Sequence, residues 1–313
     1  MKKGNTKNGT VGAKILIILG PTASGKSALA VELARKFNGE VVSADSRQVY
    51  RGLNIGTGKI TKREMRGVPH HLLDVASPMS RRKFTVADYQ KLAGKAVDDI
   101  LERGKLPIIC GGTGFYIQAL VDDVVLPDVP PNPALRKILT KKSPADLIKI
   151  LRKLDPVRAK SIDPQNPRRL IRAIEIATAL GKVPKLKNSK SKYDPLFIGL
   201  KIEPEELRRK IAVRLKARLK GRGKKNMIQE ARDLHAAGLS WKRMRELGLE
   251  YRYLADFLTG KISREQMTRE LETATWQYSR RQMGWFGRDG RIQWVEPTDK
   301  TKIEKLIIKL NKS

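Results

Sequence analysis

The sequence predicts an α/β protein, a doubly wound parallel sheet with an inserted helical domain. Short apolar segments that are typical of strands alternate with longer helical segments, which is the pattern of a parallel sheet covered by helices on both faces. The chain has 313 residues. This exceeds the roughly 250–300 residues at which a single core usually stops growing, so a second lobe is expected.

The first expected strand, at residues 14–19, leads directly into a phosphate-binding loop of the pattern G-x-x-x-x-G-K-[ST]. Backbone N–H groups of such a loop turn toward phosphate oxygens, the lysine adds a positive charge, and the final hydroxyl can bind Mg²⁺. A helix expected at 27–37 would place its anion-attracting N-terminus there. The sequence thus predicts a P-loop that binds a polyphosphate; a chance match is the alternative. The loop residues are Gly20, Pro21, Thr22, Ala23, Ser24, Gly25, Lys26 and Ser27.

The remaining strands are expected at residues 40–43, 106–110, 196–202 and 291–295, with a final helix at 301–310. The interval after the third strand is too long for one crossover connection and contains several helical stretches, which indicates an inserted lobe. The expected organisation is a disordered basic tail at 1–13, a P-loop α/β core with basic helical segments at 14–115 and 195–313, and a helical insertion at 116–194.

The helix expected at residues 167–180 presents Arg168, Arg169 and Arg172 on one face. Like charges at this spacing repel one another unless an anion bridges them. A nucleic-acid backbone would remove that repulsion, and a solvated helix face is the other interpretation.

The overall charge also indicates a polyanion. Lys and Arg number 65 against 32 Asp and Glu, a formal net charge of +33. A solvated basic surface is the alternative. The chain has one cysteine, and its N-terminal segment lacks the apolar core of a secretion signal, which favours a cytoplasmic protein. No apolar stretch approaches the roughly 18 residues of a membrane span, so no such span is expected.

Polar side chains follow the second and third strands, at the edge where open α/β sheets bind ligands. Asp45 could bind Mg²⁺, act as a general base, or cap a turn. The third strand delivers Thr113, where a P-loop ATPase more often has a metal-binding acid. A hydroxyl can donate to a leaving oxygen but cannot replace a carboxylate on a metal, which disfavours a hydrolase.

Two further segments have the composition of phosphate-binding or nucleic-acid-binding sites. Residues 56–59, Gly-Thr-Gly-Lys, look like a second phosphate loop but follow no apolar strand, so they are expected to form a turn. Residues 275–286 interleave aromatic side chains with arginines and amides on an expected helix, a mixture that can stack on bases and hold phosphates or be partly buried.

Together these residues resemble the tRNA dimethylallyltransferase family, also called tRNA isopentenyltransferases or the IPP transferase family. The resemblance extends from Ile17 to Trp294, and its most specific landmark is the run Asp45–Lys59. It implies transfer of a dimethylallyl group from dimethylallyl diphosphate to the exocyclic amine of adenosine-37, next to the anticodon, with release of diphosphate.

The resemblance also implies roles for single residues. Asp45 matches the family's general base, and Thr113 matches the threonine near the leaving oxygen. Residues 20–27 would hold the diphosphate, with Ser27 on Mg²⁺, the implied cofactor. The residues that match tRNA-contacting segments, together with the arginine face described above, are Asp45, Ser46, Arg47, Gln48, Gln165, Asn166, Pro167, Arg168, Arg169, Arg172, Thr275, Gln277, Arg280, Arg281 and Gln282.

The implied partners are the tRNA anticodon stem-loop and dimethylallyl diphosphate, with no membrane and with the chain as a monomer. The sequence departs from the common family pattern at Trp276 and Gly284, and in the segment 249–252, Leu-Glu-Tyr-Arg. Two other functions remain open on the sequence. One is a small-molecule kinase with the same loop and core, and the other is a non-catalytic RNA-binding protein with a relic loop.

Overall fold

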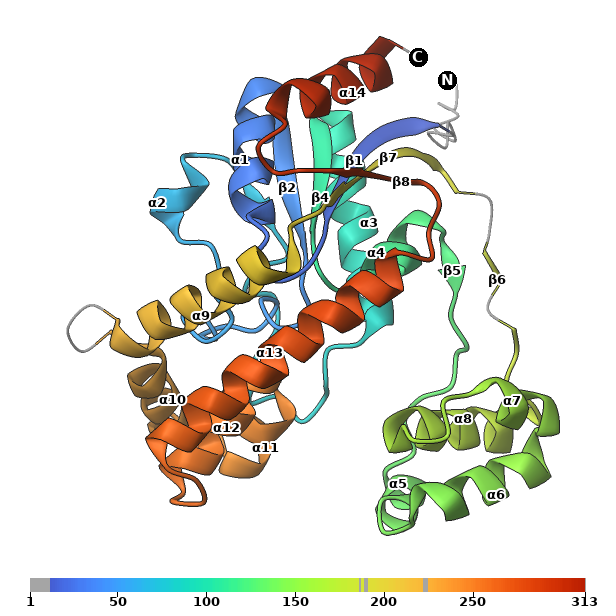
Figure 1. The fold of residues 1–313 in the computed structure, drawn as a ribbon. Coiled ribbons are helices and arrows are strands. Elements are labelled where there is room, and N and C mark those ends of the chain that lie inside the picture. Colours follow the sequence, from blue (N-terminus) through green and yellow to red (C-terminus); the bar gives the residue numbers. More distant parts are fainter. Residues whose placement is uncertain (1–11, 186, 189–190, 222–224, 313) are drawn as a thin grey trace, which may run out of the picture. The chain divides into compact units, whose positions relative to one another are not determined.

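The computed structural model describes residues 12–185, 187–188, 191–221 and 225–312 (Figure 1). Most of the basic tail expected at 1–13 therefore lies outside the described residues. The chain divides into two compact units, one formed by Met1–Asp123 with Lys190–Ser313 and the other by Val124–Ser189. The larger unit contains the main sheet.

All strands of the six-stranded sheet in the larger unit are parallel, which confirms the predicted fold class. The strand order is β3-β2-β4-β1-β7-β8. The chain first builds the sheet on one side of β1 and then on the other, so β1 lies at the switch point where such sheets bind ligands beyond their carboxyl ends. The strands are β1 (Ala13–Leu19), β2 (Gly39–Ala44), β3 (His70–His71), β4 (Leu106–Gly111), β7 (Tyr193–Leu200) and β8 (Ile292–Val295).

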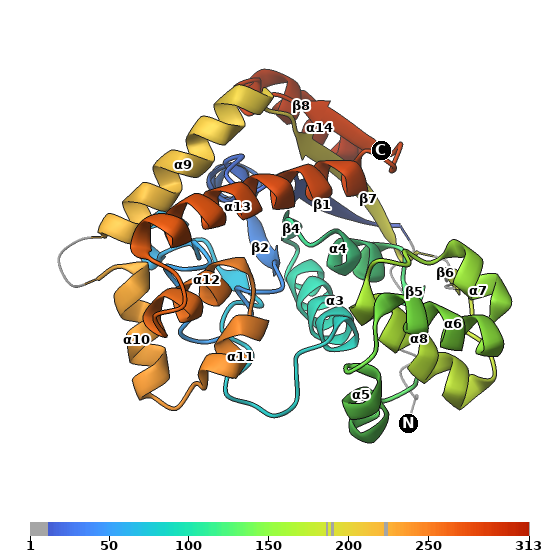
Figure 2. The same ribbon diagram turned by 60° about the horizontal axis from the view of Figure 1, so that its bottom comes forward.

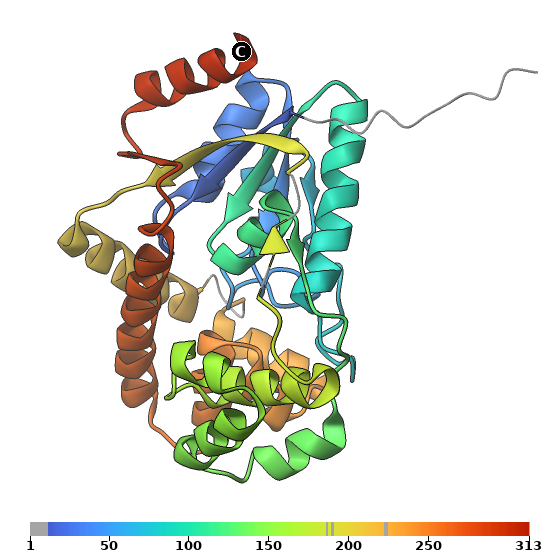
Figure 3. The same cartoon turned by 90° about the vertical axis from the view of Figure 1, so that its right-hand side faces the viewer.

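Helices cover both faces of this sheet (Figure 3). Odd-numbered residues of β1 pack toward α3 (Val86–Glu102) and α4 (Gly114–Val121), and even-numbered residues pack toward α1 (Lys26–Lys36) and α14 (Lys300–Lys312). Successive side chains of a strand point to opposite faces, so a strand covered on both sides needs a continuous apolar run. This requirement explains why every residue from Ile15 to Leu19, directly before the P-loop, is apolar and buried.

A layer of helices extends the larger unit, and its longest member, α13, runs beside α9 with α10, α11 and α12 packed nearby (Figure 2). These helices share a core that includes Met267 and Leu271 of α13. Further along the same helix, Phe286 joins the core of the sheet. Thus α13 connects the helical layer to the sheet. The helices of this layer are α9 (Pro204–Lys220), α10 (Met227–Ala236), α11 (Trp241–Glu246), α12 (Leu249–Leu258) and α13 (Arg264–Phe286). The short helix α2 (Lys62–Met65) lies beside α1 instead.

The smaller unit has a helical core of its own, formed by residues such as Leu147, Leu151, Leu170 and Ile174. The predicted helix at 167–180 is confirmed with the same bounds, because Asn166 accepts a hydrogen bond at its start and Gly181 ends it with a left-handed backbone. The elements are β5 (Val124–Val125), α5 (Pro133–Leu139), α6 (Pro144–Leu154), α7 (Pro156–Ser161), α8 (Pro167–Leu180) and β6 (Lys187–Asn188).

The boundary of the inserted lobe differs from the expected one. The expected insertion spans 116–194, whereas the smaller unit is Val124–Ser189. Residues 116–121 form most of α4, and residues 193–194 begin β7, both in the larger unit. Ile117, Leu120 and Val121 pack into the core of the sheet, so this helix is an integral part of the α/β unit. Among the described residues, no helix is long and apolar enough to cross a membrane.

Gly94 offers a test of the packing of α3. It lies inside the helix, and a methyl group built on it would meet nothing within 4 Å. Glycine inside a helix costs about 0.5–1 kcal/mol relative to alanine, so Gly94→Ala is expected to raise the free energy of unfolding by about that amount in urea titrations. Gly111→Ala is the contrasting variant, because its Cβ would lie 2.3 Å from the Ala44 carbonyl oxygen. An unchanged or lower stability of Gly94→Ala would contradict the packing described here.

Candidate active site

The P-loop follows β1 and precedes α1, the context in which the motif is meaningful. Gly20 and Gly25 have backbone φ angles of +142° and +89°, which side chains with a Cβ rarely adopt. A Cβ on Gly20 would also lie 3.0 Å from the Leu200 carbonyl oxygen. Local sterics therefore require both glycines of the motif.

Lys26 curls back over its own loop. Its Nζ donates hydrogen bonds to the Pro21 carbonyl oxygen at 2.5 Å and to Ser24 Oγ at 3.3 Å. Burial lowers the pKa of Lys26 to about 8, and the nearby charge of Arg214 acts in the same direction. A poorly solvated ammonium group beside a second cation is suited to pairing with an anion.

Asp45 follows β2, and one of its carboxylate oxygens is fixed by the backbone. Oδ1 accepts hydrogen bonds from the N–H groups of Arg47 at 2.8 Å and Gln48 at 3.3 Å. No described residue donates a hydrogen bond to Oδ2. Thus the turn-capping interpretation is correct for one oxygen, and the other oxygen remains available to take a proton.

Thr113 is joined to the Asp45 segment by a hydrogen bond. Its Oγ1 accepts from the Ser46 N–H at 3.0 Å, and its own N–H donates to the Ala44 carbonyl oxygen at 3.1 Å. Because the hydroxyl oxygen already accepts from an amide, the hydroxyl proton is free to be donated elsewhere. The carboxylate and the hydroxyl therefore occupy neighbouring segments at the carboxyl ends of β2 and β4.

Gln282 of α13 links this region to the P-loop. Its side chain is 6 % exposed. Its Oε1 accepts from the Thr22 N–H at 2.8 Å, and its Nε2 donates to the Gly112 carbonyl oxygen at 2.9 Å. A Cβ on Gly112 would lie 2.1 Å from this Nε2, so only glycine permits the close approach.

Arg214 of α9, which was not identified from the sequence, lies against the 54–58 turn and close enough to Lys26 for its charge to act on that residue. A Cβ on Gly58 would lie 2.8 Å from its Nη2, and its charge lowers the pKa of Lys26. Arg214 is accessible to solvent and makes no hydrogen bond or ion pair with any described residue. The available signal was the pair Arg214 and Arg218, like charges one helical turn apart, the same pattern that singled out the arginines of α8.

Two tyrosines lie in the electrostatic neighbourhood of Asp45. Burial raises the pKa of Tyr278 on α13, and the Asp45 carboxylate raises it further. Burial likewise raises the pKa of Tyr116, which stacks on Tyr89 with ring centroids 4.2 Å apart. Both phenols therefore stay protonated at neutral pH and can donate hydrogen bonds.

Comparison with known proteins places this chain in a family. The IPP transferase family model matches residues 48–289. The chain is 38% identical over 302 residues to a tRNA dimethylallyltransferase from Anoxybacillus flavithermus, covering 95% of this chain and 94% of the relative. The chain belongs to the IPP transferase family.

Other relatives agree with this assignment. A tRNA dimethylallyltransferase 2 from Treponema denticola is 43% identical over 289 residues, 90% of this chain and 95% of the relative. A tRNA isopentenylpyrophosphate transferase from Bacillus halodurans has a similar structure, with a TM-score of 0.71, 35% identity and coverage of 96% and 97% of the two chains. The structure of a eukaryotic dimethylallyltransferase acting on tRNA is also similar, with a TM-score of 0.76 and 28% identity. The match covers 95% of this chain and 77% of the other.

The residues that the resemblance predicts to contact RNA fall in both units. In the larger unit, Gln277, Arg280 and Arg281 are exposed on α13, whereas Thr275 and Gln282 are buried. Asp45, Ser46, Arg47 and Gln48, which carry the same prediction, are half-buried. The hydrogen bonds of Gln282 favour a role in holding the P-loop, and an RNA contact by this residue stays a prediction.

In the smaller unit, most of the residues with this prediction lie at the start of α8. Gln165, Arg168 and Arg169 are exposed there, with Asn166 and Pro167 between them. Arg172 is less available, since its Nη2 donates to the Val129 carbonyl oxygen at 2.8 Å and its Nη1 lies 3.6 Å from Glu175.

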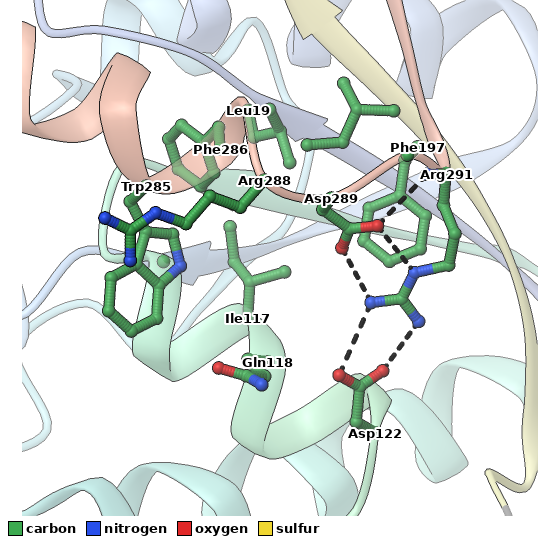
Figure 4. A pocket seen from close by; sticks show the side chains of 13 residues that line it. Leu19, Ile117, Gln118, Asp122, Phe197, Trp285, Phe286, Arg288, Asp289 and Arg291 are labelled. Carbon is green, nitrogen blue, oxygen red and sulfur yellow. Dashed lines mark hydrogen bonds and ion pairs between the residues drawn. The ribbon is translucent and has the colours of Figure 1, made fainter. Parts of the chain in front are cut away.

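A cavity of about 410 Å³ lies close to the site, bordered by α4, the end of α13 and the strands β7 and β8 (Figure 4). Arg291 reaches into it between Asp122 and Asp289 and pairs with each at 2.7 Å. With Arg288 also in the lining, two cationic side chains face two carboxylates, and much of the remaining lining is apolar, including Ile117 and Phe286. This IPP transferase therefore offers an anion a better site at the P-loop than in this cavity.

Proposed function

We propose that this chain transfers a dimethylallyl group from dimethylallyl diphosphate to the exocyclic amine of adenosine-37 in tRNA and releases diphosphate. The observation that carries the proposal is the hydrogen bond of 3.0 Å between the Ser46 N–H and Thr113 Oγ1. This bond holds the Asp45 segment against Thr113, and within the described part of the chain Asp45 Oδ2 accepts no hydrogen bond and the Thr113 hydroxyl donates none. Family membership and the names of the relatives support the substrates.

Asp45 acts as the general base. The adenosine amine attacks the C1 carbon of the dimethylallyl group, the C1–oxygen bond breaks, and its electron pair leaves with the diphosphate. Oδ2 of Asp45 receives the proton that the amine loses. A positioned base of this kind contributes about 10²–10⁴ to the rate.

The leaving diphosphate is stabilised by the P-loop N–H groups, Lys26 and Arg214, while the Thr113 hydroxyl donates to the oxygen of the breaking bond. Fixed donors aimed at developing charge are usually the largest catalytic contribution. Ser27, which is exposed at the start of α1, would hold Mg²⁺ together with diphosphate oxygens. One or two protein ligands suffice for this cation when phosphates supply the others, and it would neutralise part of the diphosphate charge.

The basic helices supply the RNA-binding surface. Exposed arginines of α13 and of α8 would contact the phosphates of the anticodon stem-loop, and the formal charge of +33 favours a polyanion throughout. The target base would leave its stack to reach Asp45. All the proposed reacting groups lie in the larger unit.

The proposal is tested by measuring the products formed from dimethylallyl diphosphate, Mg²⁺ and tRNA, with ATP supplied in a parallel reaction. A prenyl transferase releases one diphosphate for each tRNA modified and leaves ATP unchanged. Consumption of ATP with phosphorylation of a small molecule, and no release of diphosphate, would favour the kinase instead.

The pKa of Lys26 predicts a pH dependence. A lysine with a pKa of about 8 is charged below that pH and becomes neutral above it. We therefore expect kcat/KM for dimethylallyl diphosphate to fall above pH 8, because this parameter reports the ionisation of the free enzyme. Lys26→Arg keeps its charge in that range, so whatever activity it retains should lack this fall. A profile of the unchanged protein that stays level to pH 10 would contradict the assignment.

A further inference from the structure

Glu230 of α10 makes four hydrogen bonds, three of them to consecutive backbone amides. Its carboxylate accepts from the N–H groups of Asn54 at 3.0 Å, Ile55 at 2.7 Å and Gly56 at 2.9 Å. It also accepts from the Tyr251 hydroxyl at 2.6 Å. Successive N–H groups that converge in this way form an anion-binding concavity.

This arrangement explains why residues 56–59 look like a second phosphate loop. The segment is a turn, as the sequence predicted, and the amides that lead into it do bind an anion. That anion is the carboxylate of Glu230, so these N–H groups are already occupied within the protein.

The turn held by Glu230 contacts two of the cationic side chains of α9, Arg214 and Arg218. Arg218 Nη1 donates to the Gly56 carbonyl oxygen at 2.6 Å. Arg214 packs against Gly58, where a Cβ would lie 2.8 Å from Nη2. A displacement of the turn would therefore move the surface against which Arg214 rests.

The departure from the family pattern at residues 249–252 belongs to the same arrangement. The ring of Tyr251 packs on Gly56, where a Cβ would lie 2.6 Å from it, and Tyr251 is buried. Glu250 lies 3.4 Å from Arg218 Nη1. Neighbouring residues of α12 thus contact the turn and the arginine that the turn holds.

We propose that Glu230 is a positioning residue, which fixes the 54–58 turn together with Tyr251 and so directs Arg214 toward the diphosphate at the P-loop. The inference rests on the proposed function for the identity of that diphosphate. The inference extends that function, because it attributes part of the affinity for diphosphate to a carboxylate that does not touch the substrate.

The test combines Glu230→Gln and Arg214→Ala in a double-mutant cycle, with binding of inorganic diphosphate and Mg²⁺ measured by calorimetry. Glutamine keeps the shape of glutamate but turns an N–H donor toward backbone N–H groups. We expect each single variant to weaken diphosphate binding about tenfold, the change in affinity that corresponds to losing one hydrogen bond to a charged group. The double variant should be no weaker than Arg214→Ala, because Glu230 acts through Arg214.

Three measurements separate positioning from a general effect on folding. Glu230→Gln should accelerate hydrogen exchange of amides 54–56, raise the KM for dimethylallyl diphosphate and leave the affinity for tRNA unchanged. Tyr251→Phe removes one of the four hydrogen bonds and should cause a smaller change in the same direction. Asp233→Asn is the matched control, since Asp233 is exposed on α10 and, among the described residues, its carboxylate accepts only from the Gln229 side chain.

The proposal would be overturned if the double variant lost as much diphosphate affinity as the two single variants together. It would also be overturned if Glu230→Gln accelerated exchange of amides 54–56 but left diphosphate binding unchanged. An equal loss of diphosphate and tRNA binding would show a structural role instead. A protein that binds diphosphate as described but transfers no prenyl group would refute the proposed function while leaving the role of Glu230 intact.

Discussion

Asp45→Asn is expected to slow prenyl transfer by about 10²–10⁴ without weakening tRNA binding. Asparagine keeps a carbonyl oxygen that can accept from the N–H groups of Arg47 and Gln48, the two bonds that now hold Oδ1. The turn should therefore survive. The amide has no carboxylate oxygen to take the proton from the adenosine amine, so only the chemical step is impaired.

Single-turnover rates with saturating substrates measure this step, and the affinity for tRNA is measured in parallel. Asp45→Ala removes the cap as well as the base and should lose both activity and stability. Asp194→Asn is the matched control, because Asp194 is exposed at the start of β7, away from the carboxyl ends of the strands. A single-turnover rate for Asp45→Asn within a few-fold of the unchanged protein would exclude Asp45 as the base.

Lys26→Met should lower kcat/KM for dimethylallyl diphosphate by about 10²–10³, the effect of removing one donor aimed at developing charge. Methionine keeps most of the apolar stem and removes the ammonium group, which now donates to Pro21 and Ser24 of its own loop. Charge on the diphosphate grows as the C1–oxygen bond breaks. The loss should therefore appear in kcat as well as in KM.

Lys36→Met is the control for this variant. Lys36 lies at the other end of α1, where it pairs with Glu304 at 2.6 Å, and half of its side chain is exposed. Its replacement should leave the kinetic parameters unchanged. If Lys26→Met changed only the affinity for tRNA, the P-loop would not be the diphosphate site.

The parts of the fold that the sequence predicted correctly depend on local patterns. The continuous apolar run of β1, the P-loop glycines and the caps of α8 each specify their geometry within a few residues of chain. The short strand β3 carries no such pattern, because two residues are too few to show a periodicity. Its position follows from pairing with β2.

The contacts that complete the site could not be predicted, because they join distant segments. Gln282 is 260 residues from Thr22 along the chain, and its burial follows from the packing of α13 across the sheet. Glu230 likewise meets Asn54 only when α10 packs beside the turn. An exposed amide in an RNA-binding helix and a buried amide that holds a loop look alike in a sequence.

The boundary of the smaller unit illustrates the same limit. Residues 116–121 follow a glycine-rich turn and precede a proline-rich segment, so the sequence favoured a domain boundary near their start. Their side chains fill the face of the sheet beneath α3, and only the tertiary structure shows that this face needs them.

The most direct test of the central claim is to locate the prenyl group by mass spectrometry, after tRNA has been incubated with labelled dimethylallyl diphosphate and Mg²⁺. We predict label on the exocyclic amine of adenosine-37 with the unchanged protein, and almost none with Asp45→Asn. Label at another nucleoside, or no label with the unchanged protein at any tRNA concentration, would contradict the proposed reaction.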